Sequence, residues 1–86
     1  MKTGMLWFDD DPKRTLEEKV EHAAVRFHEK YSVAPDLCYA NPHTVPEAER
    51  TVALKHTQVR GGTAKILMKQ ARSILPNHFW LGVASD

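Results

Sequence analysis

The sequence predicts one small domain spanning residues 1–86, of the α/β (or α+β) class, in which one long helix packs on a mixed sheet. Three observations lead to this prediction. A chain of 86 residues has the length of a single domain. Its most strongly periodic segment, within residues 9–31, has the apolar spacing of an amphipathic helix. The other apolar runs are short and typical of strands, so a sheet is the expected partner of that helix.

The first strand and the long helix are expected to follow one another directly. Residues 4–8 contain consecutive apolar side chains, which indicates a strand buried on both faces. Two N-caps compete for the start of the helix. One is Asp11, with Pro12 at the first helical position, and the other is Thr15, in a capping box with Glu18. The apolar stripe of the helix consists of Leu16, Val20, Ala23, Ala24, Phe27 and Tyr31.

A second strand is expected at residues 36–40, after the extended step that the Ala-Pro pair at 34–35 imposes. Strand, helix and strand form a right-handed β-α-β unit if the two strands are parallel neighbours, which the short connections favour. Capping-box spacing around Pro46 then predicts one or two helical turns over residues 46–50.

Residues 51–75 fit two structures. Apolar spacing from Ala64 to Leu75 fits a helix, with Thr63 as N-cap and Pro76 as the stop. Alternatively, residues 52–59 and 64–69 are two strands of a hairpin around Gly61-Gly62. Periodicity alone prefers the helix, and residues 79–83 form a last strand in either case. The expected core residues are Met5, Leu6, Phe8, Leu16, Val20, Ala24, Phe27, Leu37, Tyr39, Ile66 and Trp80.

The two ends of the chain resemble a group of small bacterial α/β proteins of uncharacterised function. The resemblance covers residues 5–42 and 72–83, and its motifs are an N-terminal LWFDxDP strand and helix start and a C-terminal LPxHFWxG ending. In that group, prolines precede the Leu-Pro pair, which implies an extended chain over residues 69–74 here and favours the hairpin. The resemblance implies no activity, cofactor or partner.

Charge is unevenly distributed along the chain. Residues 1–50 have a net charge of −3 and residues 51–86 have +4, although the whole chain has only +1. A basic face of this kind binds polyanions. The candidate nucleic-acid-binding residues are therefore Lys55, Arg60, Lys65, Lys69, Arg72 and His78. The alternative is a solvated face whose lysines keep an edge strand from pairing wrongly, and this alternative is favoured.

Asp9, Asp10 and Asp11 are weak candidates for a metal site. Carboxylates at the end of a strand hold Mg²⁺ in many α/β proteins, and this run resembles the first acidic pocket of a phospho-receiver domain. The third-strand Asp and the later Lys-Pro pair of such a domain are missing. Acids before a helix are also what capping and the helix dipole favour, and this interpretation is preferred.

Cysteine and histidine supply no strong motif. Cys38, His43, His56 and His78 lack the spacing of a zinc site, and Cys38 lies in an apolar run where a thiol is usually a small buried hydrophobe. His78 precedes two aromatic residues, which fits either a stacking platform or, by preference, a turn before a core strand.

No cofactor is predicted, and a non-catalytic role is favoured over an enzyme. Three functions remain, in order of preference. They are a binding module for a protein or a second copy of the chain, a nucleic-acid accessory domain that uses residues 55–72, and a small metal-dependent enzyme that uses Asp9–Asp11 with His43 or His78. A cytoplasmic location is expected, because the start of the chain is not a signal peptide, no run is apolar enough for a membrane, and the single cysteine forms no internal disulfide.

Overall fold

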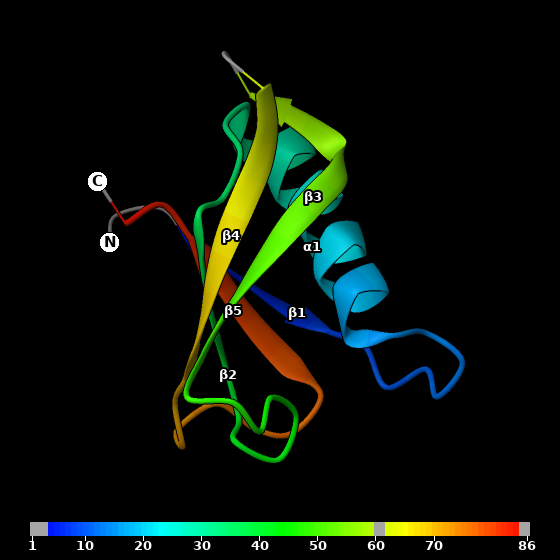
Figure 1. Ribbon diagram of the computed structural model, residues 1–86, viewed down its shortest axis with the longest axis vertical. Coiled ribbons are helices and arrows are strands. Elements are labelled where there is room, and N and C mark those ends of the chain that lie inside the picture. The colour runs from blue at the N-terminus through cyan, green and yellow to red at the C-terminus, as the bar shows by residue number, and fades with distance from the viewer. Residues whose placement is uncertain (1–3, 60–61, 85–86) are drawn as a thin grey trace.

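The computed structural model describes the backbone of residues 4–59 and 62–84, and the side chains of these residues except those of 56–59 and 62–63. One helix follows the first strand, and five strands form one mixed sheet of order β1-β5-β2-β4-β3 (Figure 1). Only β2 and β4 are parallel neighbours. The predicted fold class is therefore confirmed. The elements are β1 (Gly4–Phe8), α1 (Leu16–Tyr31), β2 (Leu37–Ala40), β3 (Glu49–Val59), β4 (Gly62–Gln70) and β5 (His78–Gly82).

The β-α-β start is split. β1 and β2 run in the same direction, but β5 lies between them and is antiparallel to both. The two strands are therefore not neighbours, as the simple unit would require. β5 pairs with β1 on one side and with β2 on the other. The parallel partner of β2 is β4, on the side away from β5.

Helix α1 begins at the capping box and not at the aspartates. The Thr15 hydroxyl accepts a hydrogen bond from the Glu18 backbone N–H at 3.2 Å, and the Glu18 carboxylate accepts one from the Thr15 backbone N–H at 3.0 Å. The helix ends at Ser32, whose backbone is left-handed (φ 61°) and whose N–H donates to the His28 carbonyl at 2.8 Å. Of the two competing N-caps, Thr15 is thus the one used.

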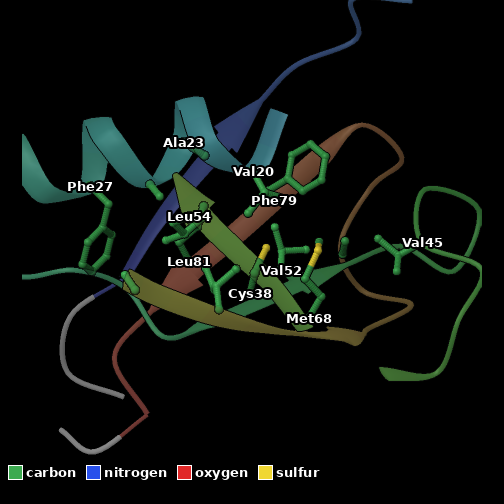
Figure 2. Close-up of a cluster of buried hydrophobic side chains, with 14 residues drawn as sticks. Val20, Ala23, Phe27, Cys38, Val45, Val52, Leu54, Met68, Phe79 and Leu81 are labelled. Atoms are coloured by element: carbon green, nitrogen blue, oxygen red, sulfur yellow. The ribbon is translucent and has the colours of Figure 1, made fainter. Parts of the chain in front are cut away.

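The core lies between α1 and one face of the sheet (Figure 2). Val20, Ala23, Ala24 and Phe27 of the predicted stripe are fully buried, while Leu16 and Tyr31 pack partly buried at the ends of the helix. Opposite them, each strand contributes alternate residues, as a pleated sheet requires. The sheet side of the core contains Cys38, Ala40, Val52, Leu54, Ala64, Ile66, Met68, Phe79 and Leu81.

The prediction that β1 is buried on both faces is wrong. Its burial alternates, so that Met5 and Trp7 pack against the core while Leu6 and Phe8 are 55% and 54% exposed. The reason is that only one face of the sheet has a helix over it. Trp80 was also expected in the core, but its neighbour Phe79 occupies that place.

Two further predictions concern residues 46–75. The helical turn expected over residues 46–50 is absent, because β3 already begins at Glu49. Of the two alternatives for residues 51–75, the hairpin is confirmed and the helix is wrong. β3 and β4 are antiparallel partners, with a shift of register between Leu54 and Gln58. Gly62 pairs with Val59 and so belongs to β4 rather than to the connection.

Within the described residues, α1 is too short and too polar to cross a bilayer.

Candidate functional site

The face of the sheet opposite α1, called here the open face, is the candidate site. Strand register defines it, because directly paired residues share a face. One row of partners crosses all five strands from β1 to β3: Leu6, Trp80, Tyr39, Lys69 and Glu49. By the same register, the open face also includes Phe8, His78, Leu37, Leu67, Thr51 and Lys65.

Aromatic side chains gather on the β1–β5–β2 part of the open face. Trp80 and Tyr39 are direct cross-strand partners, and both are half-buried. The Trp80 indole covers Gly4, because a Cβ on that glycine would lie 2.2 Å from Trp80 Cζ2. Glycine at position 4 therefore lets the indole lie down against β1. On the adjacent row, the rings of Phe8 and His78 are 4.8 Å apart.

A tight turn places His78 at the start of β5. The His78 backbone N–H donates to the Leu75 carbonyl at 3.1 Å, and Asn77 has φ 64°, which fits a type II turn with Pro76 at its second position. His78 Nδ1 lies 2.9 Å from the Pro76 carbonyl oxygen. Because that oxygen can only accept, the geometry favours a proton on Nδ1 and leaves Nε2 as the free ring nitrogen.

The β4 part of the open face is basic. Lys65 is exposed, and the Lys69 side chain is 42% exposed. Lys69 Nζ lies 3.9 Å from Glu49 Oε1, a distance typical of a weak surface pair. Among the described strand residues, Glu49 is the single carboxylate that the register places on this face. The open face therefore joins an aromatic half to a half with more cations than anions.

The structure brings together only some of the predicted basic residues. Lys65, Lys69 and His78 share the open face. Lys55 instead lines a groove of about 1000 Å³ between α1 and β3, and Arg72 is exposed in the loop after β4. Arg60 lies outside the described residues.

The aspartates organise the loop before α1. Asp9 is buried, and its carboxylate accepts hydrogen bonds from the Asp11 N–H and from Arg14 Nη1, both at 3.0 Å. Burial alone would raise the Asp9 pKa, but these two hydrogen bonds and the positive charges of Arg14 and Lys19 outweigh it and lower that pKa. Asp11 accepts from the Lys13 N–H at 2.9 Å, and Asp10 is exposed.

The cysteine and histidine candidates do not come together. Cys38 faces the core, where desolvation raises the pKa of its thiol to about 12, so it is unsuited to act as a nucleophile. His43 is exposed in the turn after β2, and the side chain of His56 is outside the description. In the described part of the chain, no three His, Cys, Asp or Glu side chains are placed to share a metal ion.

Sequence reasoning missed Leu6, Phe8, Tyr39 and Trp80 as surface residues. The signal was present, since adjacent residues of a strand point to opposite faces and only one helix was predicted.

Comparison of the chain with protein families, curated proteins and solved structures finds no match. The site is therefore interpreted from its own chemistry.

Proposed function

We propose that the protein is a non-catalytic module that binds single-stranded nucleic acid on the open face of its sheet. The observation that carries the proposal is the single row in which Trp80 and Tyr39 stand beside Lys69. Flat aromatic side chains next to cations are the usual means by which sheets hold unpaired bases together with their phosphates.

The aromatic pair supplies the base-binding part. Bases stack on aromatic rings without regard to sequence, and each stacked base contributes about 1–3 kcal/mol. The Trp80 indole lies against β1, because Gly4 has no side chain in its way. The ring is therefore already restricted, and binding a base costs little further conformational entropy. Leu67 lies next to this row and is half-buried, whereas its partner Leu37 is 8% exposed and offers little surface to a base.

The lysines supply the phosphate-binding part. Lys65 and Lys69 lie on the same face of β4, four residues and so roughly 13 Å apart. Contacts to phosphate release counterions, so affinity should fall steeply as salt rises. Glu49 opposes this attraction at Lys69, and Glu49→Gln should strengthen binding.

The first test is a fluorescence-anisotropy titration with labelled single-stranded oligonucleotides of deoxythymidine and of uridine. Tyr39→Leu and Trp80→Leu keep an apolar cover on the sheet and remove the rings. A loss of about 1–3 kcal/mol on each substitution corresponds to roughly 5- to 150-fold weaker binding. Lys65→Gln and Lys69→Gln should each make the negative slope of log K against log salt shallower by about 0.7.

The matched control is Lys30→Gln, which removes the same charge from the exposed side of α1. It should change neither the affinity nor the salt slope by the amount seen for Lys69. No anisotropy change for the parent at low salt, or equal losses for Lys30→Gln and Lys69→Gln, would refute the proposal. Melting curves of every variant separate loss of binding from loss of folding.

We expect the protein to act in a reducing compartment such as the cytoplasm, where its thiol persists.

A further inference from the structure

The two edge strands of the sheet, β3 and β1, differ in how they are protected. Edge strands expose unpaired N–H and C=O groups, and proteins shield them with charges, prolines, bulges or a covering element. β3 contains the charged residues Glu49, Arg50 and Lys55, a shift of register interrupts its pairing with β4, and α1 lies beside it. The Glu21 carboxylate even accepts the Lys55 backbone N–H.

β1 has no charge, proline or bulge along its length, although the Tyr31 hydroxyl contacts its edge at the Gly4 carbonyl. Its sequence, GMLWF, contains no charge and no proline, and its pairing with β5 has no bulge. Within the described residues, it pairs with β5 alone. Leu6 and Phe8 are also among the most exposed large apolar side chains of the chain. An uncharged apolar edge of this kind is a template for another strand.

The unused backbone groups of β1 can be identified from its register. The Asp9 N–H donates to the Asn77 carbonyl at 3.0 Å, one step beyond the Phe8–His78 pair. Hydrogen-bonded pairs alternate along an antiparallel ladder, so Met5 and Trp7 also bond to β5. Gly4, Leu6 and Phe8 therefore direct their N–H and C=O groups to the free edge. The Tyr31 hydroxyl donates to the Gly4 carbonyl at 2.9 Å, which keeps a second lone pair.

We infer that β1 is a self-association edge, and that its occupant is β1 of a second copy of this chain, antiparallel about a two-fold axis at Leu6. In this register Leu6 faces the second copy's Leu6, and Gly4 faces its Phe8. All three outward residues then make hydrogen-bonded pairs, and every cross-strand neighbour is apolar. Phe8 of one copy lies over the glycine of the other, next to the Trp80 indole that already covers it.

The symmetry has a consequence for the open face. Paired residues share a face, so the two open faces lie on the same side of one continuous ten-stranded sheet. The apolar Leu6 and Phe8 side chains of both copies meet at its centre. The inference does not depend on nucleic acid, and it concerns a different part of the face from Lys65 and Lys69.

Cysteine cross-linking tests both the partner and the register. Hydrogen-bonded antiparallel partners have Cα atoms about 5.5 Å apart, within the range of about 4.4–6.8 Å that a disulfide spans. Leu6→Cys should therefore form a covalent dimer under mild oxidation, and Leu75→Cys is the control. Leu75 is 66% exposed and lies in the loop before β5, outside the proposed strand pair. The native Cys38 is buried and should not contribute.

Sedimentation velocity without oxidant gives the second, independent measurement. The parent should sediment as a dimer at high concentration, and Leu6→Lys should be monomeric, because it sets like charges opposite each other at the axis. Leu75→Lys should leave the dimer intact. A parent that stays monomeric from micromolar to millimolar concentration would overturn the inference, as would a dimer that survives Leu6→Lys. Oligonucleotide binding by a monomeric parent would overturn only the inference and leave the proposed function standing.

Discussion

Replacing Asp9 by asparagine distinguishes a structural aspartate from a metal ligand. The Asp9 side chain is only 4% exposed and accepts two hydrogen bonds, from the Asp11 N–H and from the Arg14 guanidinium, both at 3.0 Å. Asp9→Asn removes the charge and keeps one oxygen acceptor. Asp10→Asn is the matched control, because Asp10 is exposed and stands next to it in the same run.

The size of the effect follows from these contacts. Hydrogen bonds to a charged group contribute about 1.5–3 kcal/mol each. Arg14 is 38% exposed, so water screens its share, and the asparagine oxygen still accepts from the Asp11 N–H. A loss of about 2 kcal/mol is therefore expected, which lowers the melting temperature by about 8–16 °C for a domain of this size. Asp10→Asn should shift it by less than about 4 °C.

The stability difference should also depend on pH in a defined direction. Net interactions in the folded state lower the Asp9 pKa below its ordinary value of 3.8. Its stabilisation is therefore present above the unfolded pKa and is lost as the pH falls through the lower folded pKa. The difference between parent and Asp9→Asn should be complete at pH 5–7 and should begin to narrow as the pH falls below about 4.

Thermal melts from pH 3 to 7, with and without Mg²⁺, check both parts. If the aspartates bound Mg²⁺, the parent would be stabilised by the ion through mass action, and both asparagine variants would lose that effect. The structural account expects no effect of the ion and a large loss for Asp9→Asn alone. Equal losses for the two variants, or a gap that does not narrow as the pH falls from 5 to 3, would refute the reasoning.

Two other substitutions or probes test the helix start and the buried thiol. Thr15→Ala removes the acceptor for the Glu18 N–H and should cost about 1 kcal/mol, or about 4–8 °C in melting temperature, whereas the exposed Thr51→Ala should be nearly neutral. Cys38, with a thiol pKa raised to about 12 by burial, should react with a disulfide reagent at pH 8 only as fast as the domain opens, and immediately in denaturant. Fast reaction of the folded protein would contradict its burial.

The fold class was predictable because the local signals of α1 agreed with one another, although periodicity alone preferred a helix where β4 lies. The stripe of α1 has the helical period, its capping box is complete in sequence, and the hairpin strands are flanked by glycine. The position of β5 was not predictable in this way. Nothing in the spacing between β1 and β2 states that a strand from the far end of the chain separates them, since this depends on long-range pairing.

The open face is where local reasoning failed, and its failure has a physical cause. Consecutive apolar residues in β1 suggested burial on both faces, which holds only when both faces are covered. A chain with one long helix covers one face, so Leu6 and Phe8 had to lie on the other. The same argument separates Phe79, which packs under α1, from Trp80, which does not.

Consecutive apolar residues in a strand therefore indicate a binding surface when only one face of the sheet is covered by a helix. Alternation would have placed polar residues at positions 6, 8 and 80 at no cost to the core, because these side chains do not reach it. Their apolar or aromatic character contributes little to the packing that holds α1 on the sheet. The structure places Leu6 and Phe8 on the edge strand β1 and places Trp80 next to Tyr39, which pairs with Lys69; these are the positions that the proposed second strand and unpaired bases would contact. The two interactions proposed above account for residues that folding leaves unexplained.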